Sequence, residues 1–233
     1  MKPITLYKKF LSHYGEQLWW PVTEANALKP TYRARPGLSE RQKLEICLGA
    51  ILTQSTDWKN VMKALENLNR AKMLSSPKMA KASLPKIAAL IRPSGYYNQK
   101  AKKVRAFCSH LEKNYNGKLR GLLSKPLEEL RKELLSLHGI GPETADDIIL
   151  YAAQKPSFVA DAYTTRFTSR FFALKETDYV DVKGFFESRL PGDAALFSEL
   201  HALFVEHGKR FCRKKPDCGG CFLKKGCKFF RLA

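Results

Sequence analysis

The sequence has no apolar run long enough to cross a membrane. No segment of its 233 residues approaches the ~20 consecutive apolar residues that a membrane-spanning helix needs. Residues 1–14 show neither the apolar region nor the small-residue cleavage site of a signal peptide. These absences predict a cytoplasmic protein with no membrane-spanning segment, in a compartment where paired disulfides are rare.

Acidic residues are scarce relative to basic ones. The chain carries 41 Lys and Arg against 22 Asp and Glu, which gives a formal net charge of +19 at pH 7. An excess of this size opposes compaction unless a polyanion binds it. Nucleic acid is the first candidate for that partner, and an anionic membrane surface is the second.

Alternating strand patterns are also lacking, and helical periodicity dominates. Ser39 and Gln42 form a predicted capping box in front of the apolar run 44–52, and Asp57 is expected to cap the next helix. Pro126 suits the first turn of a later helix. The remaining predicted helices cover 99–112, a leucine stripe at 127–137, 143–153, 163–173 and 193–207. The sequence therefore predicts an all-α fold.

The six cysteines are of two kinds. Cys47 and Cys108 lie within apolar helical patterns and are interpreted as small buried side chains. The other four follow the pattern Cys-x5-Cys-x2-Cys-x5-Cys and are Cys212, Cys218, Cys221 and Cys227. Four thiolates suit a cubane iron–sulfur cluster or a tetrahedral zinc ion. One C-x2-C turn with longer arms favours the cluster, with zinc or unliganded thiols as the alternatives.

Basic side chains surround these cysteines. The only acidic residues near the cysteines are Glu206 and Asp217. The basic residues there are Lys209, Arg210, Arg213, Lys214, Lys215, Lys224, Lys225, Lys228 and Arg231. A charge run of this kind is often just a solvated tail. A loop pinned by a metal group would instead present the cations as a fixed surface, which favours contact with phosphates.

Two short motifs precede the cysteine loop. Residues 137–141 (Leu-His-Gly-Ile-Gly) fit either an ordinary turn between helices or a hairpin whose backbone amides hold a phosphate. Asp161 follows the apolar residues 158–160 and is placed to cap a helix that begins at Ala162. Capping is compatible with catalysis, because a helix N-terminus stabilises a carboxylate that must face positive charge.

Taken together, these elements resemble the endonuclease III branch of the helix–hairpin–helix DNA glycosylase superfamily. The matching segments occur in the family's order: 52–57 (Leu-Thr-Gln-Ser-Thr-Asp), 95–101 (Gly-Tyr-Tyr-Asn-Gln-Lys-Ala), the hairpin 137–141, the Asp161 segment, and His207-Gly208-Lys209 before the cysteines. The first gap of the cysteine loop has five residues where the family has six.

The resemblance implies two helical domains flanking a DNA-binding cleft. One, a six-helix barrel with the helix–hairpin–helix motif, would span 35–155. The other, with a 4Fe-4S cluster loop, would join 1–34 to 156–233. The implied partner is double-stranded DNA with damaged bases and not a membrane, which indicates a nucleoid-associated location. A monovalent cation bound at the hairpin is also expected. The sequence shows no sign of oligomerisation, so a monomer is expected.

The resemblance also assigns roles to single residues. Asp161 matches the catalytic aspartate, which stabilises an oxocarbenium-like sugar after the nucleotide is flipped out of the duplex. Gln54 and Tyr96 match the residues that fill the gap and wedge the duplex. The expected DNA contacts are Gln54, Tyr96, Gly139, Gly141 and Lys209.

The residue after the hairpin predicts the type of reaction. Strand-cutting members of the family carry a lysine there, which forms a Schiff base with the sugar. This chain has Glu143, and a carboxylate cannot form an imine. The sequence therefore predicts a monofunctional glycosylase that leaves an abasic site, with Glu143 bordering the base pocket.

The substrate prediction depends on a few aromatic and polar positions. The adenine-mismatch branch has a glutamate where this chain has Ala50. Segments 19–21, 48–54 and 92–98, together with Glu143, instead resemble the 3-methyladenine glycosylases. An N3- or N7-alkylated purine is cationic, so it needs no general acid to leave and is attracted to aromatic faces. Trp19 and Trp20 are the candidate faces, with core packing as the alternative.

Two other functions compete with this prediction. One is a mismatch or oxidised-base glycosylase on the same scaffold, and the other is a non-catalytic DNA-binding protein.

Overall fold

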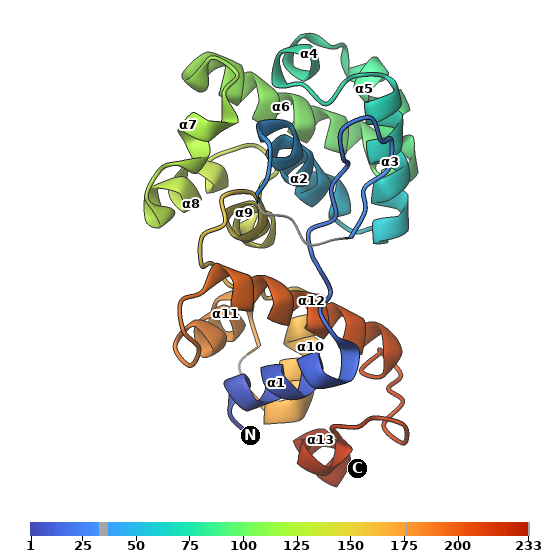
Figure 1. Ribbon diagram of the computed structural model, residues 1–233, viewed down its shortest axis with the longest axis vertical. Helices are drawn as coiled ribbons and strands as arrows, with labels where there is room; N and C mark the ends of the chain where they lie inside the picture. The colour runs from blue at the N-terminus through green and yellow to red at the C-terminus, as the bar shows by residue number, and fades with distance from the viewer. Residues whose placement is uncertain (33–36, 176, 233) are drawn as a thin grey trace. The chain divides into compact units, whose positions relative to one another are not determined.

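The computed structural model describes residues 1–32, 37–175 and 177–232, and the regular elements in this part of the chain are helices (Figure 1). Extended pairing among the described residues is limited to an isolated bridge between Val22 and Thr31. The all-α prediction is confirmed. None of the described helices combines the length and apolar character needed to span a membrane.

The chain divides into two compact units, residues 20–155 and residues 1–19 with 156–233. The boundary predicted from sequence at 34/35 falls within residues 33–36, which lie outside the described part of the chain. Trp19 and Trp20, although adjacent in sequence, belong to different units.

The unit of residues 20–155 is built around one buried helix, α2 (Glu40–Thr53). Its residues 44–52 are buried on every face, as is typical of a helix at the centre of a core. Around it lie α3 (Trp58–Arg70), α4 (Ser76–Lys81), α5 (Leu84–Ile91), η1 (Arg92–Ser94), α6 (Tyr97–Tyr115), α7 (Leu119–Leu123), α8 (Leu127–Leu135), α9 (Pro142–Asp147) and the π-turn η2 (Ile148–Ala152).

The segment 20–32 is fixed to this unit by a buried carboxyl. Thr23 donates its backbone amide and its hydroxyl to the Glu45 side chain, over 3.0 and 2.5 Å. Asn69 in turn donates to the Thr23 hydroxyl and to the Leu28 carbonyl. Burial raises the pKa of Glu45 even though these hydrogen bonds oppose the shift. The network holds the chain that carries Trp20 against α2 and α3.

The second unit has an aromatic core. Its elements are α1 (Pro3–Tyr14), α10 (Ala162–Phe172), α11 (Tyr179–Glu187), α12 (Ala194–Arg210), η3 (Lys224–Gly226) and α13 (Lys228–Leu232). Phe10 of α1 packs against Phe167 of α10 and Phe204 of α12, with ring centroids 5.5 Å apart in both pairs. These contacts bring together the two ends of the chain, which the sequence separates by more than a hundred residues.

Several local predictions can be checked directly. The Ser39–Gln42 capping box is present, and Cys47 and Cys108 are fully buried. Asp57 occupies the N-cap of α3 but its side chain accepts no capping hydrogen bond, so the predicted side-chain cap is wrong. Pro126 is the N-cap residue of α8 rather than part of its first turn.

Candidate active site and nucleic-acid interface

Asp161 occupies the N-cap of α10, at the end of the buried segment 158–160. Its Oδ1 accepts the backbone amide of Thr164 at 2.7 Å, and its Oδ2 lies 3.7 Å from Nε2 of the buried His201 on α12. Burial alone would raise the pKa of this carboxyl, but the nearby His201 ring and the hydrogen bond from the Thr164 amide outweigh it. The pKa of Asp161 is therefore lowered from its ordinary value. The group is an anion held in an apolar setting, suited to stabilising a neighbouring cation.

His201 links this carboxylate to an aromatic side chain. The indole of Trp19 meets the His201 ring edge-on, with centroids 5.8 Å apart, and Trp19 is half-buried. Neither a motif nor a spacing identifies His201 in the sequence, because it lies on the buried face of α12 among apolar residues. The structure thus adds His201 to the predicted site.

Trp20 belongs to an aromatic group in the other unit. It is buried and meets Trp58 and Tyr151 edge-on, each at 5.0 Å between centroids. A Cβ on Gly49 would lie 3.3 Å from its Nε1, so the indole packs closely against α2. Trp19 and Trp20 lie outside helical segments.

The hairpin between α8 and α9 depends on one glycine with left-handed backbone. Gly139 has φ +80°, and a Cβ there would lie 2.4 Å from the Lys103 side chain. Gly141 differs, because it has φ −92° as the N-cap of α9, and a Cβ there would meet no atom within 4 Å. The open space beside Gly141 is where a phosphate can approach the amides of the helix N-terminus. Glu143 lies exposed in the first turn of that helix.

Gln54 lies directly after α2, and its side chain is bonded to the hairpin. Its Nε2 donates to the Gly139 carbonyl at 3.0 Å and to the Thr144 hydroxyl at 2.9 Å. Lys103 donates to its Oε1 at 2.5 Å. In this structure Gln54 therefore orders the hairpin, and entry into a duplex requires it to leave these partners.

Tyr96 is the most exposed of the large apolar side chains in the described part of the chain, at 72%. It is the N-cap residue of α6 and has φ +46°, a left-handed conformation that is rare for a bulky residue. An exposed aromatic ring on a constrained turn suits insertion between bases.

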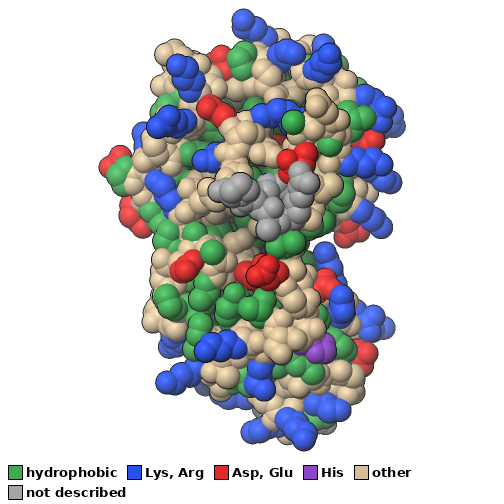
Figure 2. All heavy atoms as spheres, viewed as in Figure 1, with side chains coloured by type: hydrophobic (Ala, Val, Ile, Leu, Met, Phe, Trp, Pro, Cys, Tyr) green, Lys and Arg blue, Asp and Glu red, His purple; other side chains and the backbone are tan. Residues whose placement is uncertain are grey.

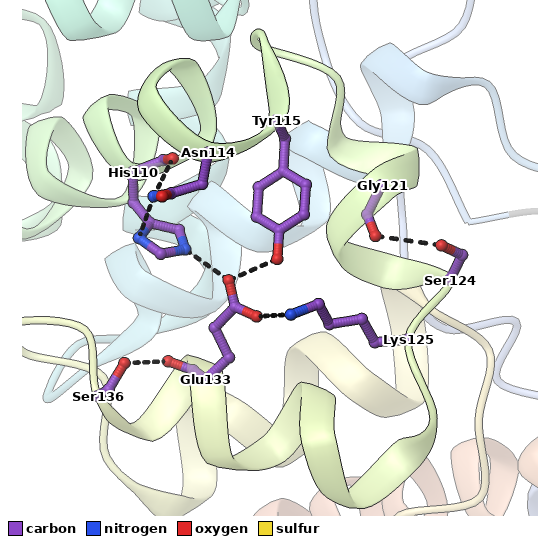
Figure 3. Close-up of polar contacts among 8 residues, drawn as sticks. All are labelled: His110, Asn114, Tyr115, Gly121, Ser124, Lys125, Glu133 and Ser136. Carbon is purple, nitrogen blue, oxygen red and sulfur yellow. Dashed lines mark hydrogen bonds and ion pairs between the residues drawn. The ribbon is translucent and has the colours of Figure 1, made fainter.

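Two polar groups hold α8, the first helix of the hairpin motif. Arg131 makes two hydrogen bonds to the buried Asp146 of α9, at 2.9 and 3.2 Å. On the other side, Glu133 binds His110 and Tyr115 of α6 and Lys125, which precedes α8 (Figure 3). The three partners outweigh burial and lower the pKa of Glu133 to about 2. The hairpin is thus presented on a rigid support.

The four cysteines of the C-terminal loop line a single cavity together with Phe167, Phe171 and Leu223. Arg170 of α10 lies 3.5 Å from the Cys212 sulfur, and the Leu223 amide bonds to the Cys221 sulfur. In the described ranges, no group of three or more His, Cys, Asp or Glu side chains is arranged to hold a metal ion. What the loop offers is a cavity lined by four thiols and apolar side chains, with N–H donors beside two of the sulfurs.

Basic side chains are spread over the viewed face of both units (Figure 2). Lys209 is exposed in the last turn of α12, beside Arg210, which pairs with Glu206 at 2.5 Å. Arg166 and Arg170 turn toward the cysteine loop, where they donate to the carbonyls of Cys212 and Arg213 at 2.8 and 2.6 Å. These two arginines, which the sequence analysis missed, fix the backbone that carries the basic residues 213–215.

Comparison with known proteins agrees with this architecture. Residues 48–191 match the HhH-GPD superfamily of base excision DNA repair proteins. The chain is 41% identical over 224 residues to a Methanocaldococcus jannaschii protein provisionally named a DNA repair glycosylase, covering 95% of this chain and 94% of that one. It is 29% identical over 193 residues to endonuclease III of Thermotoga maritima, covering 82% and 85%.

A solved structure of a DNA glycosylase has the same fold. The 3-methyladenine DNA glycosylase of H. pylori superposes with a TM-score of 0.72 at 29% identity, covering 90% of this chain and 98% of that one. The chain belongs to the HhH-GPD superfamily of base excision DNA repair proteins, in its endonuclease III branch. Its class is therefore that of the DNA glycosylases, which hydrolyse N-glycosidic bonds, and DNA is its partner.

Proposed function

We propose that this protein is a monofunctional DNA glycosylase that removes alkylated purines of the 3-methyladenine type and leaves an abasic site. The proposal rests on two separate observations: the carboxyl of Asp161 has a lowered pKa, and the position of the family's strand-cutting lysine is occupied by Glu143. The resemblance of residues 19–21, 48–54 and 92–98 to that subgroup also supports it. So does the H. pylori relative, a 3-methyladenine glycosylase solved with 1,N6-ethenoadenine.

In this proposal Asp161 acts on the sugar. The alkylated purine already carries positive charge, so its bond to C1′ breaks without protonation of the base. The positive charge that remains on the sugar is stabilised by the carboxylate, whose anionic form is held by the Thr164 amide and His201. Water then adds to C1′, and its proton is lost to Asp161 or to solvent.

Base selection is assigned to aromatic side chains. Trp19 beside His201 and Trp20 beside Trp58 and Tyr151 are the proposed contacts for a cationic ring, by stacking and cation–π attraction. Glu143 is the proposed polar group at the pocket edge. A neutral, undamaged purine lacks the charge for these contacts and forms a stronger glycosidic bond, so it is left in place.

DNA contact is assigned to the hairpin and the basic loop. The amides near Gly139 and Gly141 would hold one phosphate, Lys209 another, and Gln54 and Tyr96 would enter the duplex. A monovalent cation at the hairpin carbonyls is part of this proposal. We also propose that the enzyme acts as a monomer.

The four cysteines of the loop fit a 4Fe-4S cluster in number and surroundings, because all of them line one apolar cavity and two of their sulfurs accept hydrogen bonds, from Arg170 and from the Leu223 amide. Cys212, Cys218, Cys221 and Cys227 would hold it. When bound, the cluster would cross-link the four cysteines and fix the conformation of the loop, and it would take no part in bond breaking. A yellow-brown protein absorbing near roughly 400 nm supports a cluster, whereas a colourless zinc-loaded protein contradicts it.

The absence of a strand-cutting lysine is tested by borohydride trapping on duplexes that contain an abasic site. A Schiff base would be reduced to a permanent protein–DNA adduct. We expect none from the wild type and a detectable adduct from Glu143→Lys. An adduct formed by the wild type contradicts the monofunctional assignment.

A further inference from the structure

One fully buried lysine has no place in the function proposed so far. Lys100 lies in the first turn of α6 and is 2% exposed. Among the described residues no carboxylate forms an ion pair with it. Since a buried ammonium without a carboxylate is costly, its hydrogen bonds must compensate. Its partners therefore indicate what it does.

The Lys100 ammonium binds two backbone carbonyls from different segments. It donates to the Leu52 carbonyl at 2.8 Å and to the Ser94 carbonyl at 2.7 Å. Leu52 lies in the last turn of α2, where carbonyls have no partner within the helix and the dipole favours a cation. Ser94 ends η1.

Each bonded carbonyl lies two residues before a side chain assigned to the duplex. Leu52 precedes Gln54, and Ser94 precedes Tyr96. The Lys100 backbone amide makes the first hydrogen bond of α6, to the Tyr96 carbonyl at 3.0 Å, so the ammonium lies on the residue that closes the turn of the left-handed Tyr96. A single ammonium thus sets the spacing between the two segments.

We propose that Lys100 is a positioning residue that holds Gln54 and Tyr96 at the separation needed to enter damaged DNA together. This inference rests on the proposed function, because it concerns how those two side chains meet the duplex. It assigns Lys100 no contact with DNA and no part in bond breaking. Burial and the neighbouring Lys103 lower the pKa of Lys100 to about 8, and either protonation state can donate to both carbonyls.

The test compares affinity for a duplex containing a tetrahydrofuran abasic-site analogue with affinity for the same duplex undamaged. We expect Lys100→Met to lower this ratio roughly tenfold, as expected for losing a charged hydrogen-bond donor. The affinity for undamaged DNA and its salt dependence should stay unchanged. Lys102→Met is the matched control, because Lys102 is an exposed neighbour on the same helix and its loss removes the same charge.

A double-mutant cycle separates positioning from general destabilisation. In a Gln54→Ala, Tyr96→Ala background, adding Lys100→Met should leave the ratio unchanged, because nothing remains to position. Circular dichroism monitors folding, and Lys100→Gln, which keeps a donor on a shorter stem, replaces the methionine variant if that does not fold.

The possible outcomes are distinct. An unchanged ratio in Lys100→Met, or an equal loss in both backgrounds, overturns the positioning role. A wild type that does not discriminate between the two duplexes contradicts the proposed function instead.

Discussion

At the scale of single residues, the pKa of one carboxyl is lowered in a place where burial alone would raise it. The Thr164 amide and His201 achieve this for Asp161. The helix N-terminus was visible in the sequence, because an N-cap is set by neighbours along the chain. His201 was not, because a lone histidine on an apolar helix face gives no local sign of a partner forty residues away.

The first prediction concerns His201. Replacing it with Leu removes the partner that lowers the Asp161 pKa, so that pKa should rise. Because base release requires the anion, the acid limb of the single-turnover pH–rate profile should move to higher pH. His13→Gln, a change at an exposed ring, is the control. An acid limb that stays in place in His201→Leu contradicts the role given to this pair.

At the scale of elements, the hairpin is held by side chains that the sequence could not assign. Gln54 binds Gly139 across 85 positions of sequence, and Glu133 gathers partners from α6 and from the segment before α8 (Figure 3). Periodicity predicted the longer helices, and 193–207 was found as 194–210, but it did not predict α1 or α11. It could not predict these contacts, because long polar side chains can reach many partners and only the tertiary fold selects one.

The second prediction is that Glu133→Gln lowers the free energy of unfolding by about 1–3 kcal/mol at pH 7, the range for losing hydrogen bonds to a charged group. The pKa of Glu133 is lowered to about 2, so its contribution is present above its unfolded value and is lost as pH falls toward 2. Urea unfolding at pH 7 and pH 3 measures this. The difference from wild type should shrink at pH 3, and exposed Glu129→Gln should show none at either pH.

The third prediction separates the two hairpin glycines. Gly139→Ala forces a side chain into a left-handed conformation and against Lys103, so it should destabilise the fold by about 1 kcal/mol. Gly141→Ala meets open space, so it should leave the melting temperature unchanged while weakening DNA binding, because its Cβ occupies the phosphate's approach. Equal DNA affinity for Gly141→Ala and wild type would contradict the proposal that a phosphate binds beside Gly141.

At the scale of the whole molecule, charge and composition indicated the partner before any fold was known. The net charge of +19 pointed to a polyanion, and the order of motifs from 52 to 227 pointed to a repair enzyme. The sequence could not predict that Trp19 and Trp20 belong to different units, because the division of the chain between them depends on tertiary contacts.

The fourth prediction follows from that charge. The logarithm of DNA affinity should fall linearly with the logarithm of salt concentration, with a slope of about −0.9 for each phosphate contacted. Lys214→Ala or Lys209→Ala should each reduce the slope by roughly 1 if the side chain contacts a phosphate. Glu129→Gln serves as a control far from the basic loop in sequence. A slope unchanged by both lysine variants contradicts a phosphate-binding role for the loop.

The most direct test of the central claim is base release from methylated duplex DNA, identified by chromatography, with the strand analysed for nicks. The account predicts free 3-methyladenine, an intact strand carrying abasic sites, and a loss of roughly 10²–10³ in rate for Asp161→Asn, which should still bind abasic-site DNA. Release of oxidised pyrimidines in place of 3-methyladenine, or an Asp161→Asn variant with unchanged turnover, would contradict it.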